Sequence, residues 1–175
     1  MSGISINPML IIVVIAALFK IVDGRKKGMV KEVISLITML VLSVFAALAA
    51  YGLRSYNDGR VFNVIAVVIL LFLLMIVHHV LSLFFFSAKL ISKLPIVHFA
   101  DKLLGIVFGV FEVVLVLWTL YAFIMMMDIG PIGQIILTYT EESSVLRWIY
   151  QHNYLALGIE RFLKEFQFIP ISIKF

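Results

Sequence analysis

Long uncharged apolar segments constrain the fold of this chain more than any other feature. Residues 33–53 form a run of about 20 residues without a charged side chain. At 1.5 Å per residue, an α-helix of this length crosses about 30 Å, which is the thickness of the hydrocarbon core of a bilayer. Backbone polar groups find no water there, so they must be satisfied within a helix. The segment therefore predicts a membrane-spanning helix.

Three further apolar segments accompany this one, so that the four cover residues 4–22, 33–53, 61–86 and 103–127. Hydrophobic residues make up 63% of the chain and charged residues 14%. The mean hydropathy is +1.16. These values lie outside the range of soluble globular domains. We predict an all-α, multi-pass membrane protein, with a domain of four transmembrane helices over residues 1–130 and an amphipathic tail over residues 131–175.

Lysine and arginine are distributed unevenly among the connections, and this predicts the orientation of the helices in the membrane. Basic connections stay on the cytoplasmic side of a membrane. Both termini are therefore expected outside the cytoplasm. The first segment is expected to be retained, because basic residues follow it instead of preceding it as in a signal peptide. The first and third connections hold Lys20, Arg25, Lys26, Lys27, Lys31, Lys89, Lys93 and Lys102, whereas the second holds Arg54 and Arg60.

Two segments have a pattern that suits the membrane surface better than its interior. Residues 87–100 are short and basic, and we interpret them as a cytoplasmic interfacial elbow before the fourth helix. An ordinary loop broken at Pro95 is the alternative. In the C-terminal tail, apolar side chains between Leu155 and Phe166 recur at helical spacing opposite charged ones. This helical tail lies flat on the outer surface or packs onto the bundle, and the sequence favours neither.

The sequence offers few groups for catalysis. The absence of cysteine excludes thiolate metal sites and cysteine nucleophiles. His78 and His79 are adjacent, and adjacent helical side chains point about 100° apart, so one metal ion does not readily bind both. A lipid-modifying enzyme would have to use Asp101, His98 and Lys102. We expect no enzymatic activity, no metal and no cofactor, and no nucleic-acid partner, because the basic residues are not interleaved with aromatic ones.

Glu112 is the only charged residue of the fourth segment. An ionisable group inside the hydrocarbon is costly and usually faces a partner or water. Counted from the cytoplasmic ends of the helices, Glu112 is about 16 Å deep and the two histidines are about 11 Å deep. The similar depths predict a hydrogen bond or ion pair between Glu112 and His78 or His79. We interpret it first as a structural contact between helices three and four, and alternatively as part of a polar pathway.

Small residues predict where helices approach one another closely. Gly105 and Gly109 lie on one face of the fourth helix, and a face without side chains admits a second backbone. A tight contact with the second helix, or between protomers, follows from this. Asp101 and Lys102 stand at the start of the fourth helix, where an acid caps free N–H groups and a lysine meets phosphate headgroups. The second helix has a similar face of small residues, namely Ser43, Ala46, Ala47 and Ala50.

Two stretches resemble the signatures of the colicin V production protein family. "DKLLGIVFGVFE" (residues 101–112) has the family's Asp-Arg/Lys-Leu-Leu-Gly start and a second glycine four residues on, and "DGRKKGMVKEV" (residues 23–33) resembles its basic, glycine-containing turn. The resemblance extends to about residue 128. The chain departs from the family at Asn7 and Pro8, where an Asp is frequent, and at Glu112, where a basic residue is common. The family positions are Gly24, Lys27, Gly28, Asp101, Lys102, Leu104, Gly105 and Gly109.

This resemblance implies a multi-pass protein of the bacterial cytoplasmic (inner) membrane that takes part in production or export of a peptide toxin and in envelope homeostasis. We expect a non-enzymatic protein that acts in the lipid bilayer through helix packing, as a homo-oligomer or with another membrane protein. The alternative is a small transporter or channel component with a polar path near Glu112 and His78/His79. A pore or carrier needs polar groups along the whole membrane depth. The sequence shows them at one depth only, near helices three and four, which favours the first interpretation.

Overall fold

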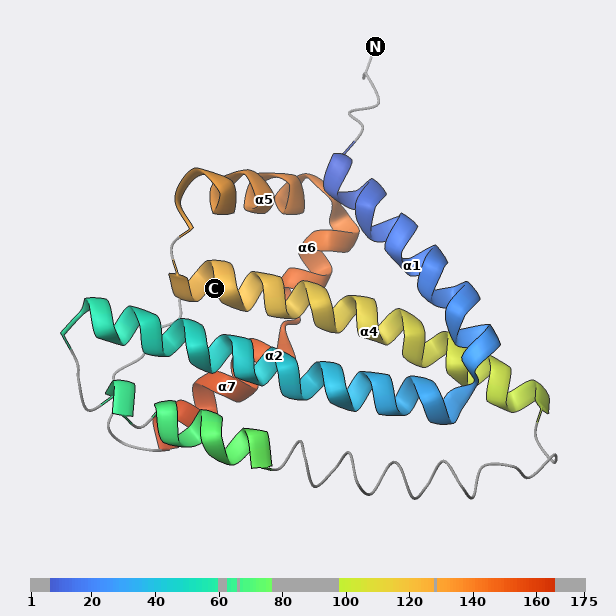
Figure 1. The fold of residues 1–175 in the computed structure, drawn as a ribbon. Helices are drawn as coiled ribbons and strands as arrows, with labels where there is room; N and C mark the ends of the chain where they lie inside the picture. Colours follow the sequence, from blue (N-terminus) through green and yellow to red (C-terminus); the bar gives the residue numbers. More distant parts are fainter. Residues whose placement is uncertain (1–6, 60–62, 66, 77–97, 128, 166–175) are drawn as a thin grey trace, which may run out of the picture.

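The computed structural model describes residues 7–59, 63–65, 67–76, 98–127 and 129–165, and nearly all of them are helical (Figure 1). The all-α prediction is confirmed for these residues. No strand occurs among them. Residues 63–65 and 67–76 are helical as well. The labelled helices are α1 (Pro8–Lys27), α2 (Met29–Asn57), α4 (His98–Met127), α5 (Gly130–Glu142), α6 (Ser144–Gln151) and α7 (Tyr154–Glu165).

The long helix α4 lies at the centre, and α1, α2, α6 and α7 pack against it (Figure 1). The helix α2 runs parallel to α4. At their starts, the Met29 N–H donates to the Asp101 carboxylate at 2.9 Å. Near their ends, the Arg54 guanidinium donates to the Met126 carbonyl at 3.3 Å. The helix α1 runs in the opposite direction, and only Gly28 separates it from α2.

Local sequence explains where α1 begins and ends. The Asn7 side chain accepts a hydrogen bond from the Leu10 N–H at 3.0 Å, and Pro8 occupies the first turn, where its missing N–H has no partner to lose. The helix ends at Gly28, whose φ of 79° favours glycine. The predicted end at residue 22 was wrong. Of the basic residues expected in the first connection, Arg25, Lys26 and Lys27 form the last turn of α1.

Among the described residues, two helices are long and apolar enough to cross a membrane, namely Met29–Asn57 and Ala100–Met127. The topology with four spans stays a prediction. The predicted third span includes the described helical residues 63–65 and 67–76, and Asn63 donates a hydrogen bond to the Tyr51 hydroxyl on α2 at 3.1 Å. The helix α4 begins at His98 and not at Leu103. Most of the predicted elbow lies outside the described residues, as do His78 and His79.

The described part of the tail packs onto the bundle. The Trp118 indole N–H on α4 donates to the Ile149 carbonyl on α6 at 2.9 Å. The Asn153 side chain donates to the Trp118 carbonyl at 2.9 Å and accepts from the Ala156 N–H, which caps α7. The Tyr121 and Thr140 hydroxyls hydrogen-bond at 3.0 Å. These buried bonds support the packed interpretation of the tail over the interfacial one.

Candidate functional site

The two family-like stretches meet in space where the turn between α1 and α2 contacts the start of α4. The Asp101 carboxylate accepts from the Met29 N–H and so caps the start of α2. Asp101 lies in the first turn of α4, as expected of an acid at the start of this helix, but the N–H group that it caps belongs to α2 and not to α4. A Cβ on Gly28 would overlap the Asp101 carboxylate, and its positive φ also disfavours any other residue.

Three glycines bring the backbones of α1 and α4 into contact. A Cβ on Gly24 would overlap the Gly105 carbonyl, and a Cβ on Gly105 would overlap the Gly24 carbonyl. A Cβ on Gly109 would lie 2.8 Å from the Lys20 carbonyl oxygen. We call Gly24, Gly105 and Gly109 the glycine seam. Such close approach requires residues without side chains.

The partner predicted for this seam was wrong. The glycines face α1, and the small-residue face of α2 meets α4 elsewhere. There the Thr119 hydroxyl donates to the Ser43 hydroxyl at 2.6 Å, while Ala47 and Ala50 are fully buried. Gly105 and Gly109 contact α1 and Thr119 contacts α2, so the two neighbours use different faces of α4. Of the remaining family positions, Lys102 is half-buried and Leu104 is exposed.

Glu112 is buried beside the seam and is paired on two sides. Its Oε1 lies 2.8 Å from the Lys20 ammonium on α1, and its Oε2 accepts from the Ser35 hydroxyl on α2 at 3.1 Å. Glu112 therefore joins three helices. The histidine partners predicted for it lie outside the described residues. Lys20 and Ser35 were missed, although Lys20, Gly24 and Gly28 recur every four residues and so share one face of α1.

A second pair of charges lies one turn closer to the α1–α2 turn. The Lys27 ammonium pairs with the Asp23 carboxylate, and both side chains are partly exposed. This hydrogen bond lowers the pKa of Asp23 below its usual value and raises the pKa of Lys27. On its other side, Lys27 lies 3.8 Å from the Glu32 Oε1. Glu32 is fully buried, and neither of its oxygens has a hydrogen-bond partner among the described residues.

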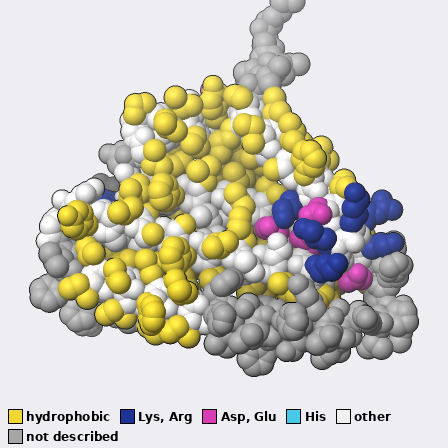
Figure 2. Space-filling view, viewed as in Figure 1, with side chains coloured by type: hydrophobic (Ala, Val, Ile, Leu, Met, Phe, Trp, Pro, Cys, Tyr) yellow, Lys and Arg dark blue, Asp and Glu magenta, His cyan; other side chains and the backbone are white. Residues whose placement is uncertain are grey.

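The charged groups gather at one end of the molecule, and the rest of the same face is largely apolar (Figure 2). A hollow of about 510 Å³ lies between α1 and α4 at this end. Its polar lining is formed by Lys20, Asp23, Lys26 and Glu112, and its apolar lining by residues such as Phe19.

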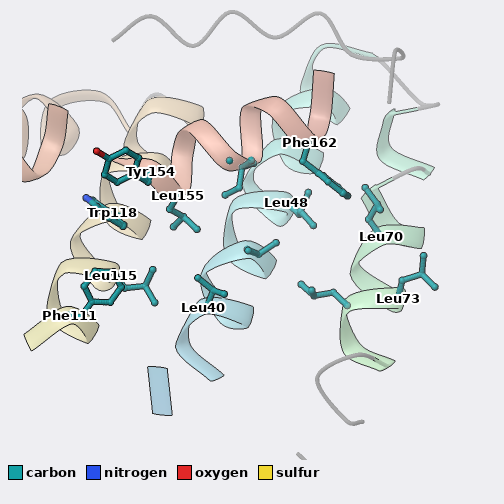
Figure 3. A pocket seen from close by; sticks show the side chains of 14 residues that line it. Leu40, Leu48, Leu70, Leu73, Phe111, Leu115, Trp118, Tyr154, Leu155 and Phe162 are labelled. Atoms are coloured by element: carbon teal, nitrogen blue, oxygen red, sulfur yellow. The ribbon is translucent and has the colours of Figure 1, made fainter. Parts of the chain in front are cut away.

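A larger groove of about 710 Å³ lies on the other side of α4 and is almost entirely apolar (Figure 3). Phe111, Leu115 and Trp118 of α4 form one wall, and Leu70 and Leu73 form the opposite one (Figure 3). Side chains of α2 and α7 complete the lining.

Within the described ranges, no group of three or more His, Asp or Glu side chains is placed to hold a metal ion. Asp101, which the enzyme hypothesis would use, is engaged by the Met29 N–H. The profile of the Colicin V production protein family matches residues 9–153, which extends beyond the two stretches into α5 and α6. No curated protein and no solved structure matches the chain at a significant level.

Proposed function

The chain belongs to the Colicin V production protein family, and from this premise we propose that it is a non-enzymatic protein of the bacterial cytoplasmic membrane. It supports production or export of a peptide toxin, or homeostasis of the cell envelope. In this proposal it acts through its packed helices, as a homo-oligomer or with another membrane protein.

One observation carries the proposal: the glycines and the aspartate among the family positions are used for packing. Gly24 and Gly105 bring two backbones together, Gly28 forms the turn, and Asp101 caps α2. Each of these roles builds a fixed junction between helices. A protein whose shared residues build a junction is suited to hold or organise other membrane components.

Substitutions of Asp101 test this proposal, because they separate a cap from a titrating group. Asn keeps an oxygen that accepts from the Met29 N–H, whereas Ala removes it. In a strain that lacks the endogenous protein, we expect Asp101→Asn to restore toxin secretion and detergent resistance and Asp101→Ala to restore neither. Asp58→Ala is the matched control, since Asp58 is exposed and lies at the other end of α2.

The protein level in the membrane is measured in parallel for each variant. Full activity of Asp101→Ala at a normal level would contradict the packing proposal. Failure of Asp101→Asn at a normal level would indicate that the carboxylate charge itself is required, which favours a chemical role. For the association part of the proposal, the mass of the protein in lipid nanodiscs is the measurement. A monomer that captures no membrane protein from its host would contradict that part.

A second candidate function is a small transporter or channel component. It is favoured by the buried contact of Glu112 with Lys20 and Ser35 and by the hollow of about 510 Å³ beside it. In vesicles that contain the purified protein, this function predicts ion or proton flux that Glu112→Gln abolishes and Glu142→Gln leaves unchanged. Equal flux in protein-free vesicles would exclude it, and so would full function of a folded Glu112→Gln variant in cells.

A further inference from the structure

Glu32 is the most unusual polar side chain among the described residues. It stands in the first turn of α2, close to Lys27 of α1, and the exposed fraction of its side chain is 0%. Neither carboxylate oxygen accepts a hydrogen bond in the described structure. This distinguishes it from Glu112, which is nearly as buried but has one partner on each oxygen.

The charged groups that face Glu32 are already engaged with other partners. On α1, Lys20 pairs with Glu112 and Lys27 pairs with Asp23. Lys20, Lys27, Asp23 and the Glu112 carboxylate of α4 are the charges that act on Glu32. Lys27 is the nearest cation, but 3.8 Å to the Glu32 Oε1 is too long for a hydrogen bond.

An ionised carboxylate in such a place is energetically expensive. A buried charge is tolerated when a partner and hydrogen bonds replace the water that it has lost. Glu32 has no such bonds in the described structure, and the nearby Glu112 charge repels a second negative charge. A proton on Glu32 removes the charge that the surroundings do not stabilise. Lys27 then remains free to pair with Asp23 at the surface.

We propose that Glu32 is a buried proton-binding site, and that loss of its proton draws the Lys27 ammonium from Asp23 to Glu32. The atoms for this exchange are in place, because Lys27 contacts Asp23 and lies 3.8 Å from Glu32. Lys27 is followed by Gly28, whose turn holds α1 against α2. Proton binding at Glu32 is thereby linked to the junction that the family positions build.

This inference goes beyond the proposed function, because it concerns a ligand of the junction and not toxin export or envelope homeostasis. A proton site of this kind also differs from the Glu112 site of the second candidate function. Its readout is the protonation state of one side chain, so it succeeds or fails whether or not the protein supports export.

Infrared spectroscopy of the whole protein in nanodiscs tests the proposal at neutral pH. A protonated carboxyl group has a C=O stretching band that a carboxylate lacks. We expect such a band in the wild type, a shift of the band when glutamate is labelled with ¹³C, and loss of the band in Glu32→Gln. The Glu142→Gln variant is the matched control and should keep the band, because Glu142 is exposed at the end of α5. Absence of a glutamate band in the wild type would overturn the proposal, even if Glu32→Gln does not fold.

The exchange of Lys27 has its own test in Asp23→Asn. This variant removes the surface partner, so Lys27 becomes available to Glu32 and stabilises its ionised form. We expect the Glu32 band to disappear at a lower pH than in the wild type, whereas Asp58→Asn should leave the titration unchanged. An identical titration of the wild type and Asp23→Asn would overturn the role of Lys27.

Discussion

The glycine seam makes a graded prediction for the stability of the protein. In Gly109→Ala, the new Cβ lies 2.8 Å from the Lys20 carbonyl oxygen, about 0.6 Å short of the 3.4 Å at which ordinary contact begins. Backbone atoms cannot rotate away as a side chain does, so α1 must move. In Gly105→Ala the overlap with the Gly24 carbonyl is more severe. The helix α1 must therefore move further.

The magnitudes follow from two opposing terms. Overpacking costs about 1–3 kcal/mol, with Gly109→Ala near the middle of this range and Gly105→Ala at its upper end. Replacing glycine by alanine inside a helix returns about 1 kcal/mol. We expect Gly109→Ala to lower the free energy of unfolding by about 1 kcal/mol and Gly105→Ala by about 2 kcal/mol.

Gly158 supplies the matched control, because it lies within α7 and a Cβ there meets nothing within 4 Å. Gly158→Ala should show only the gain in helix propensity and raise the free energy of unfolding by about 1 kcal/mol. The assay is reversible unfolding of the purified variants in mixed detergent micelles, followed by circular dichroism. Equal effects of the three substitutions, or stabilisation by Gly105→Ala, would refute the backbone contact between α1 and α4.

Two further predictions concern side-chain contacts. Glu112→Lys places a cation against Lys20 and should cost about 3 kcal/mol of unfolding free energy. Combining it with Lys20→Glu should recover more than half of this loss. Combining it instead with Lys26→Glu, at the exposed neighbour, should change the loss by less than about 0.5 kcal/mol. Trp118→Phe removes the hydrogen bond to α6 and should cost about 1 kcal/mol, whereas Trp148→Phe at an exposed position should have little effect. The same unfolding assay checks both. A double variant no more stable than Glu112→Lys, or equal effects of the two tryptophan changes, would contradict the corresponding contact.

The sequence predicted the helices well and their ends less well. Apolar segments mark the hydrophobic parts of helices, but charged turns can continue a helix when their side chains project outward. This is why α1 extends to Lys27, where a connection was expected. The helix α4 also reaches beyond its apolar segment, to His98. The end of α1 is set by Gly28, and the sequence analysis had noted this glycine only as part of the family resemblance.

The candidate site was predicted in part, for a similar reason. Glu112 was recognised because a single acid within an apolar segment is visible in the sequence itself. Its partner Lys20 did not stand out, because it was counted among the basic residues at a membrane boundary. Only the order of α1, α2 and α4 in space brings Lys20 to Glu112 and Asp101 to Met29. Contacts between segments about 70 to 90 residues apart require the packing, which local patterns do not contain.

The contact between Lys20 and Glu112 also explains why an acid suits position 112 of this chain. A basic residue at position 112 would face the Lys20 ammonium, which lies 2.8 Å from Glu112. The acid is therefore compatible with this particular α1, and Ser35 on α2 satisfies its second oxygen. Position 112 faces α1 directly beyond Gly109. The charge that suits this position therefore depends on the α1 side chain opposite it, which is Lys20. The glycine seam fixes how closely α1 and α4 approach, and the acid at position 112 matches the Lys20 ammonium that α1 brings to it.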